Sequence, residues 1–175
     1  PMGSPRTADQ NGTLPVLLTC QGGTVMDYSY SSQTLTSAGS LVVDSDGPFD
    51  QDDELSYYFD GNGDYLSVAD NAALELGSGE FTMEFWMRPD TAGKPVMNSD
   101  STYHSTMVHK PSSYGFTLLG TSTNRTGVWW GVWNGTGWES YFADCSINSA
   151  NWNHIAIVRQ ASTFKIFVNG NVIVS

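Results

Sequence analysis

The sequence predicts an all-β fold, specifically a jelly-roll β-sandwich of two antiparallel sheets. The 175 residues include 14% charged residues, 13% aromatic residues and 18 glycines, a balance typical of strands and turns rather than of long helices. Short apolar segments alternate with a period of two almost throughout the chain. Turn residues separate about a dozen such segments, which is the spacing expected of a sandwich.

The first half of the chain carries short predicted strands at 16–21, 40–43, 55–59 and 65–68. An acidic loop with a Gly-Pro break, 44–54, separates the second strand from the third. After the fourth strand, the segment N-A-A-L-E-L-G at 71–77 predicts one short helical turn that Gly77 ends.

The clearest strand is predicted at 81–88, because its residues alternate in character and Pro89 ends it. One of its faces consists of Phe81, Met83, Phe85 and Met87. The other consists of Thr82, Glu84, Trp86 and Arg88. Further strands are predicted at 106–109, 115–119, 154–159, 164–168 and 171–174. Asn169-Gly170 predicts a type I′ hairpin turn, since both central residues of that turn need positive φ.

Two long segments resemble a known family. The segments "YYFDGNGDYLSVADNAALELGSGEFTMEFWMRP" (57–89) and "NWNHIAIVRQASTFKIFVNGNVIVS" (151–175) resemble laminin-G-like domains of the concanavalin A-like lectin/glucanase superfamily. The opening "LPVLLTCQGGTVMDYSYSS" (14–32) is similar to the version in structural proteins of marine tailed phages. The resemblance implies two antiparallel sheets, one of them curved, and binding of carbohydrate or protein partners.

The same resemblance predicts a single laminin-G-like domain over residues 14–175. Residues 1–4 (PMGS) are interpreted as an expression-tag remnant and residues 5–13 as a linker. Family members continue past the last hairpin with closing strands, so we expect a missing segment or a partner chain to cover the open sheet edge.

The charge balance excludes two classes of partner. The net charge is −11 and only 7 residues are Lys or Arg, so the basic footprint of a nucleic-acid or anionic-membrane binder is missing. No apolar run is long enough for a transmembrane helix. Cys20 and Cys145 both lie in or beside apolar segments, which favours two buried thiols and leaves a single disulfide as the alternative.

The sequence predicts a protein that is not an enzyme. Glucanases of this superfamily place acids at E-x-D-x-x-E spacing on one strand so that two carboxylates face one sugar. The chain lacks that spacing, and Glu84 stands alone on its strand as a solvated residue. The three histidines, His104, His109 and His154, are scattered and show no metal-ligand spacing.

The aromatic segment "GVWWGVWNG" (127–135) is the candidate binding surface. Val128, Trp130 and Val132 share one face, which we expect to point inward. The opposite face then presents aromatic rings on which a sugar ring stacks. The candidate carbohydrate-binding residues are Trp129, Trp133, Trp138 and Tyr141. The alternative is that these aromatic side chains fill the core or cover the sheet.

The D-x-N-x-D spacing of Asp60, Asn62 and Asp64 matches the start of a calcium loop. Tyr65 and Asn71 stand where an EF-hand needs Gly and Glu, so the segment is not an EF-hand. Two interpretations stay open: turn chemistry alone, or Asp60 and Asp64 lending oxygens to a Ca²⁺ ion at the rim of the sandwich. The acidic loop at 44–46 is a second candidate.

Together these features predict a non-catalytic module of a phage virion that binds host-surface carbohydrate or another virion protein. One alternative is a purely structural assembly module of a capsid or tail, with oligomers forming through the open sheet edge. Another is a fragment of a secreted bacterial adhesin. The expected location is the virion surface, with an extracellular location as the alternative.

Overall fold

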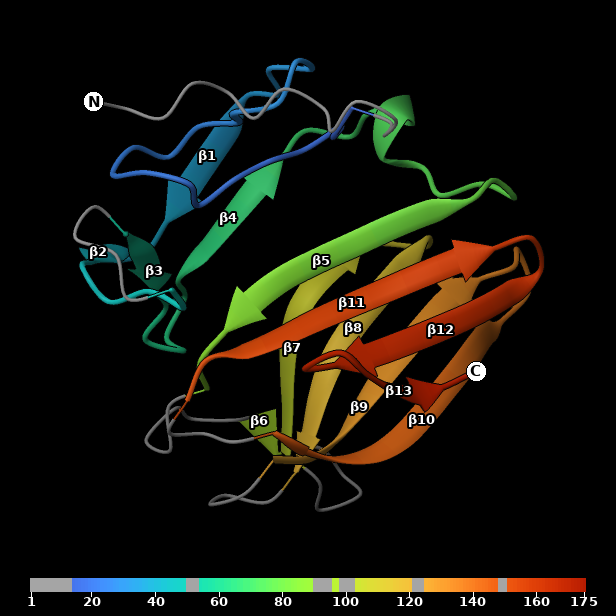
Figure 1. Cartoon of the computed structure of the whole chain (residues 1–175). Helices are drawn as coiled ribbons and strands as arrows, with labels where there is room; N and C mark the ends of the chain where they lie inside the picture. Colours follow the sequence, from blue (N-terminus) through green and yellow to red (C-terminus); the bar gives the residue numbers. More distant parts are fainter. Residues whose placement is uncertain (1–13, 50–53, 90–95, 98–102, 121–124, 148–150) are drawn as a thin grey trace. The chain divides into compact units, whose positions relative to one another are not determined.

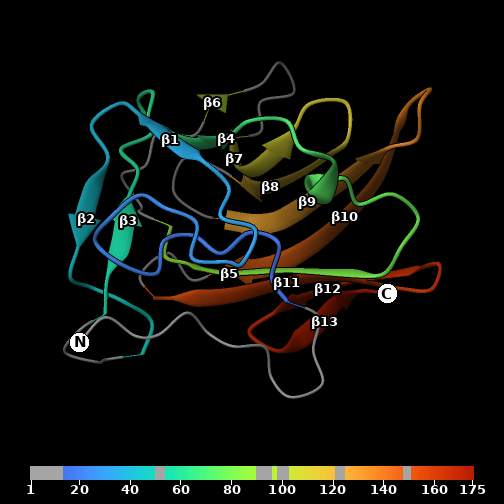
Figure 2. The same ribbon diagram turned by 90° about the horizontal axis from the view of Figure 1, so that it is seen from above.

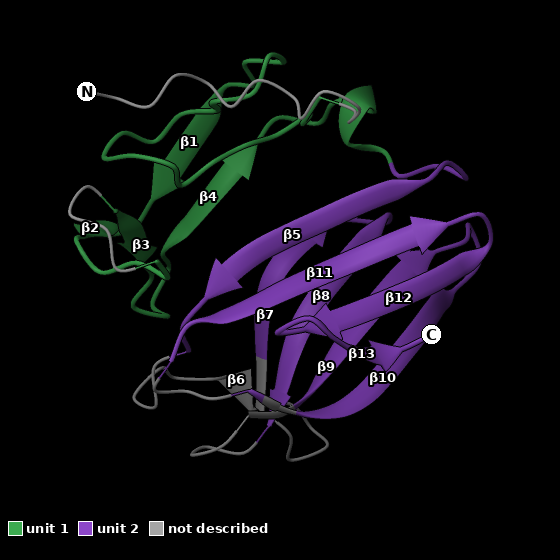
Figure 3. Ribbon diagram, viewed as in Figure 1, with its two compact units in different colours: residues 1–75 green, residues 76–175 purple. Residues whose placement is uncertain are grey.

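The structure is a computed structural model that describes residues 14–49, 54–89, 96–97, 103–120, 125–147 and 151–175. The predicted tag remnant (1–4) and linker (5–13) lie outside these residues. The chain forms two compact units, residues 1–75 and residues 76–175 (Figure 3). A single domain over 14–175 stays a prediction. None of the described residues belongs to a helix long and apolar enough to cross a membrane.

The first unit contains two small antiparallel sheets (Figure 1). In one, β1 (Leu35–Ala38) pairs with β4 (Tyr65–Val68), and in the other β2 (Val42–Asp44) pairs with β3 (Ser56–Tyr58). A 3₁₀ helix, η1 (Ala72–Leu74), follows β4 and confirms the predicted helical turn. The side-chain oxygen of Asn71 accepts a hydrogen bond from the Ala73 N–H at 2.8 Å and so caps this helix.

The strand predicted at 16–21 is wrong, because this segment has no strand structure. The Asp27 side chain is buried and accepts hydrogen bonds from the backbone N–H groups of Leu18, Ser29 and Gln33 at 2.8 to 2.9 Å. The Ser29 hydroxyl donates to the same carboxylate at 2.8 Å. Local side-chain hydrogen bonds therefore replace a strand ladder for this segment.

The second unit is a β-sandwich, which confirms the predicted all-β fold of two antiparallel sheets. The four-stranded sheet has the order β13-β12-β11-β5 and consists of β5 (Phe81–Met87), β11 (Asn153–Gln160), β12 (Thr163–Val168) and β13 (Asn171–Val174). The five-stranded sheet has the order β10-β9-β8-β7-β6 and consists of β6 (Val96–Met97), β7 (Tyr103–Lys110), β8 (Tyr114–Gly120), β9 (Arg125–Trp133) and β10 (Trp138–Ile147). Figures 1 and 2 show the two layers from the front and from above.

The core of the second unit lies between these two sheets. Phe116 and Trp130 from one sheet and Ile155 from the other are fully buried. The predicted faces of β5 are confirmed, because Phe81 and Phe85 pack against the core while Thr82, Glu84 and Trp86 are exposed. The Phe85 and Phe116 rings meet edge to face across the two layers, with centroids 5.6 Å apart.

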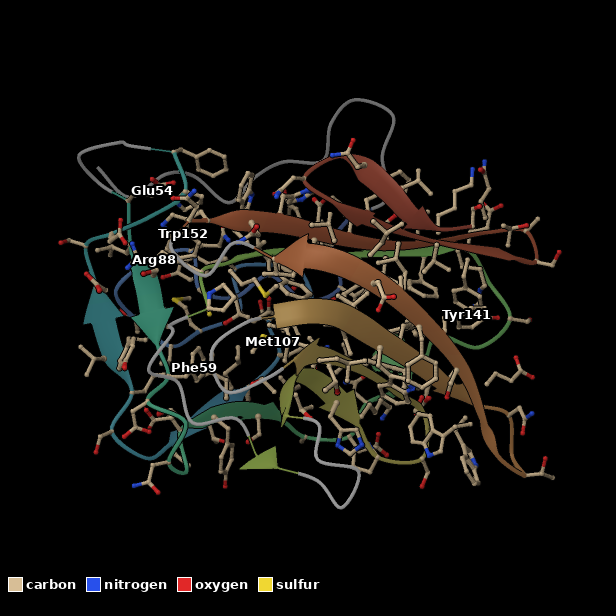
Figure 4. The ribbon with its side chains drawn as sticks, turned by 90° about the horizontal axis from the view of Figure 1, so that it is seen from below. Glu54, Phe59, Arg88, Met107, Tyr141 and Trp152 are labelled. Atoms are coloured by element: carbon tan, nitrogen blue, oxygen red, sulfur yellow. The ribbon has the colours of Figure 1, made fainter. Side chains whose placement is uncertain are left out.

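Arg159 holds the loop before β5 against the end of β11. Its guanidinium group donates hydrogen bonds to the carbonyl oxygens of Gly79 and Leu76, both at 2.6 Å. The same group lies 5.1 Å from the centre of the Phe81 ring and 5.5 Å from that of Phe164. Near the other end of β5, Arg88 lies over the Trp152 ring at 5.5 Å (Figure 4). Cations and aromatic rings thus stabilise both ends of this sheet.

The predicted Asn169-Gly170 turn is confirmed, with φ of 50° and 78° at the two residues. The Asn169 side chain accepts a hydrogen bond from the His154 N–H at 2.9 Å and donates one to Asn153 Oδ1 at 3.1 Å. The return strand β13 forms one edge of its sheet and has no strand partner on its outer side among the described residues. Coverage of this edge by another chain segment or a partner stays a prediction.

Both cysteines are free and partly buried, Cys20 in the first unit and Cys145 in the second. Burial raises the pKa of each thiol, and the neighbouring Asp144 carboxylate adds to the rise at Cys145, which reaches about 11. Thiols with raised pKa are poor nucleophiles at neutral pH. We therefore interpret Cys20 and Cys145 as packing residues rather than as reactive ones.

Candidate functional site

The hairpin of β9 and β10 builds an aromatic surface on the outer face of the five-stranded sheet. Val128 and Trp130 are fully buried, which confirms the predicted inward face of β9. The alternate residues Trp129 and Trp133 therefore lie on the outer face. The register pairs Trp133 with Trp138 and Trp129 with Phe142, so β10 adds aromatic side chains to the same face.

The turn between the two strands fixes this register. Asn134 Oδ1 accepts hydrogen bonds from the backbone N–H groups of Thr136 and Gly137 and from the Thr136 hydroxyl, at 2.9 to 3.0 Å. Its Nδ2 donates to Glu139 at 3.1 Å, and Gly135 has a φ of 97°. This four-residue turn, 134–137, therefore holds Trp133 and Trp138 opposite each other.

Two paired glycines make room for one of the tryptophans. Gly115 of β8 lies opposite Gly131 of β9. The six-membered ring of Trp129 occupies the space above this pair: a Cβ atom at Gly115 would lie 3.1 Å from Trp129 Cζ3, and one at Gly131 would overlap Trp129 Cζ2. The same Cβ at Gly131 would lie 3.0 Å from Trp138 Cε3. Glycine is therefore required at Gly131 for both rings to lie on the sheet.

The three tryptophans form a continuous row, which we call the tryptophan row (Trp129, Trp138 and Trp133). The Trp129 and Trp138 rings meet edge to face with centroids 5.6 Å apart, and Trp138 and Trp133 do the same at 5.7 Å. Trp129 and Trp133 are partly buried, whereas Trp138 is 40% exposed. The central ring of the row is thus the one most open to a ligand.

The fourth predicted aromatic residue is placed elsewhere. Tyr141 lies opposite Trp130 in the register and packs toward the core, with its ring 5.2 Å from that of Phe164. The structure thus brings Trp129, Trp133 and Trp138 together and leaves Tyr141 on the other face. Phe142, which sequence reasoning missed, is 67% exposed on the outer face. Counting by twos from Trp138 would have identified it.

Asp60 and Asp64 flank the turn between β3 and β4, two strands of the first unit that belong to different sheets. Asp64 accepts hydrogen bonds from the Ser40 N–H at 2.6 Å through Oδ1 and from the Asp60 N–H at 2.9 Å through Oδ2. The bond from Asp60, together with that from Ser40, lowers the pKa of the Asp64 carboxyl. Asp60 Oδ1 accepts a bond from the Asn62 N–H at 2.6 Å. These contacts match the turn-chemistry interpretation of the D-x-N-x-D spacing.

The same contacts fit a calcium ion poorly. Calcium takes six to eight oxygen ligands, whereas both oxygens of Asp64 already accept backbone N–H groups. The described residues contain no group of three or more His, Cys, Asp or Glu side chains arranged around a common point. At the second candidate loop, Asp44 Oδ1 accepts from the Asp46 N–H at 3.2 Å, again a turn contact. Calcium binding stays a prediction that this geometry does not favour.

Glu84 lies on the outer face of the four-stranded sheet, and its side chain is 65% exposed. Its Oε2 atom lies 3.6 Å from His154 Nε2. The His154 ring packs against Trp86 with centroids 5.0 Å apart, because the two residues are opposite each other in the register of β11 and β5. The solvated position predicted for Glu84 is confirmed, and the group beside its carboxylate is the His154 imidazole.

Comparison with known proteins identifies the sandwich. A family model, Laminin_G_3, described as the concanavalin A-like lectin/glucanases superfamily, matches residues 60–175. A solved structure titled "Crystal structure of HCR/D-Sa-GBL1/C" is similar with a TM-score of 0.59 and 17% identity, over 91% of this chain and 38% of that one. At this identity the likeness shows the fold alone, and the chain spans well under half of that structure. No curated protein matches the sequence.

Proposed function

Because the chain belongs to the Laminin_G_3 family of the concanavalin A-like lectin/glucanase superfamily, we propose that it is a non-catalytic carbohydrate-binding module. Fold does not fix function within such a superfamily, so the proposal depends on the chemistry of the site. Between the aromatic rings of the outer face stand Gly131 and Ser140, which are opposite each other in the register and carry no carboxylate. The aromatic rings and the Ser140 hydroxyl group suit this surface to stacking and hydrogen bonding.

The observation that carries the proposal is the tryptophan row with its exposed central ring. A pyranose ring presents C–H groups on one face, and these stack on the face of an exposed indole. Trp138 is 40% exposed, and Phe142 on the same face of β10 is 67% exposed. Ser140 lies between them on that strand and face and supplies a hydroxyl group for sugar hydroxyls.

Charge narrows the class of carbohydrate. The chain carries 18 acidic and 7 basic residues, so its overall field repels anionic ligands. We therefore propose neutral glycans, rather than sulfated or sialylated ones, as the ligands of the tryptophan row.

A glycan array followed by titration calorimetry on the best neutral hit tests this function. We expect Trp138→Ala to lower the affinity about tenfold or more, since the stacking contact is worth on the order of 1.4 kcal/mol. Trp86→Ala is the matched control, because Trp86 is also 40% exposed but lies on the four-stranded sheet. Unchanged binding by Trp138→Ala, or equal losses in the two variants with intact folding, would reject the site.

We also propose a virion-surface location, with an extracellular one as the alternative. Support comes from the similarity of residues 14–32 to structural proteins of marine tailed phages and from an acidity that suits a solvated outer surface. Antibody labelling of intact virions, viewed by electron microscopy, tests the location. Labelling only after disruption of the virions would contradict it.

A second candidate function is assembly through the edge strand β13. Val172 on this strand is 51% exposed, and edge strands with free backbone groups pair with strands of other chains. Light scattering across a concentration series tests this candidate. A concentration-dependent oligomer that Val172→Lys dissolves would support assembly, and a monomer at all concentrations would leave glycan binding as the better proposal.

A further inference from the structure

The turn Asp60-Gly61-Asn62-Gly63-Asp64 takes no part in the proposed glycan-binding site. Its centre is an Asn-Gly pair, and the described residues contain two others, Asn134-Gly135 and Asn169-Gly170. Asn-Gly pairs are chemically special because a glycine leaves the following backbone nitrogen sterically free to attack the asparagine amide. The three pairs share this local sequence, so any difference in their reactivity comes from the fold.

In two of the three pairs the asparagine side chain is held at both ends. Asn134 accepts hydrogen bonds on Oδ1 from Thr136 and Gly137 and donates from Nδ2 to Glu139. Asn169 accepts on Oδ1 from the His154 N–H and donates from Nδ2 to Asn153. Rotating either amide toward the following nitrogen would break these bonds, so the fold protects both side chains.

The third pair is different. Asn62 is exposed, and its side-chain amide makes no hydrogen bond with any residue that the structure describes. Its backbone N–H donates to Asp60 Oδ1 at 2.6 Å, which fixes the backbone while leaving the side chain able to rotate. Gly63 has a φ of 88°, and a Cβ atom there would meet nothing within 4 Å. The same is true of Gly135 and Gly170, so the three pairs differ in how their asparagine side chains are held rather than in crowding at the glycine.

We propose that Asn62-Gly63 is a site of spontaneous deamidation in the folded protein. The deprotonated backbone nitrogen of Gly63 attacks Cγ of Asn62, and a C–N bond forms as the Cγ–Nδ2 bond breaks. Nδ2 leaves as ammonia after taking up a proton from water, and a succinimide ring remains. Water then opens the ring at either carbonyl and gives aspartate or isoaspartate at this position, with no oxidant or reductant consumed.

The product changes the charge of the turn. Deamidation places a third carboxylate between Asp60 and Asp64 and increases the net negative charge of the chain by one. The turn therefore becomes more acidic as the protein ages, which provides a charge-based signature of the reaction in the intact protein.

Peptide mapping by mass spectrometry tests the proposal on the whole chain, held folded at mildly alkaline pH for several weeks. We expect the Asn62 peptide to deamidate about tenfold or more faster than the Asn134 and Asn169 peptides, because each of those side chains must first give up its hydrogen bonds. In urea the three rates should converge, since all three asparagines precede glycine. The Asn11-Gly12 peptide lies outside the described residues and is measured separately.

Asn62→Gln is the matched variant, because glutamine keeps the amide but forms the cyclic intermediate far more slowly. Ion-exchange chromatography of the intact protein should show an acidic species that grows with time in the parent chain. In the variant this species should be smaller by the amount that deamidation of Asn62 contributes. Equal rates at the three sites in the folded protein, or a faster rate at Asn134 or Asn169, would overturn the proposal.

Discussion

Replacing Gly131 by alanine tests whether the tryptophan row is built on the sheet as described. In an ordinary strand this substitution stabilises a protein by about 0.5–1 kcal/mol, because glycine loses more backbone entropy on folding. At Gly131 the added Cβ would overlap Trp129 Cζ2 and would lie 3.0 Å from Trp138 Cε3. The two indole rings must therefore shift, and the sign of the effect reverses.

The magnitude follows from these two opposing terms. Adding a methyl group to a packed position costs about 1–3 kcal/mol, and subtracting the entropic gain leaves a net loss of up to about 2.5 kcal/mol. For a unit of residues 76–175, each kcal/mol corresponds to a fall of about 4–8 °C in Tm. Because Trp138 is displaced as well, Gly131→Ala should also weaken binding of a neutral glycan.

Circular dichroism measures both consequences in one sample. Thermal melts report the loss of stability, and the exciton signal of the coupled indoles should weaken as the edge-to-face geometry is lost. Gly137→Ala is the matched control, because a Cβ atom there would meet nothing within 4 Å. A Tm equal to or above that of the parent chain in Gly131→Ala, with an unchanged exciton signal, would refute the packing argument.

Three further predictions concern the first unit. Asp27→Ala should destabilise its N-terminal segment by about 2–4 kcal/mol by leaving buried donors unpaired, and faster hydrogen exchange around residues 18–33 would show this. Burial of Asp27 favours a higher pKa, but the hydrogen bonds to its carboxylate outweigh burial, so the pKa is lowered in the folded protein. The stabilisation by these bonds should therefore be fully present above the usual carboxyl pKa of about 4. It should be lost as the pH falls through the lower pKa that Asp27 has in the folded state. Exchange that is unaffected by the variant or by acid would contradict both expectations. Calcium should leave the Tm unchanged, since Asp64 is already satisfied, and a rise that a chelator reverses would instead assign an ion to Asp60 and Asp64.

Periodicity predicted the sandwich because the side chains of a half-buried strand must alternate. The faces of β5 and β9 follow directly from Phe85, Trp130 and their neighbours, since the core side carries the apolar residues. The Asn169-Gly170 turn was equally predictable, because few sequences adopt positive φ twice in succession.

The incorrect and missed predictions have a different origin. The apolar run at 16–21 has the composition of a strand, but hydrogen bonds to the nearby Asp27 side chain decide its conformation. Strand β1 (Leu35–Ala38) is polar and short, so its pairing with β4 gave no periodic signal. Tyr141 was assigned to the binding surface by proximity in sequence, whereas alternation along β10 from Trp138 puts it on the opposite face. Strand pairing and hydrogen bonds from individual side chains are the information that composition and periodicity lack.

The side-chain amide of Asn169 has a consequence for the last hairpin. Asn169 lies in the turn between β12 and β13, but its amide bonds His154 and Asn153, which belong to β11. The amide therefore ties this turn to a third strand of the sheet. Insertions in the turn would move the amide away from β11, so they should be tolerated less well than insertions in loops that lack such a contact.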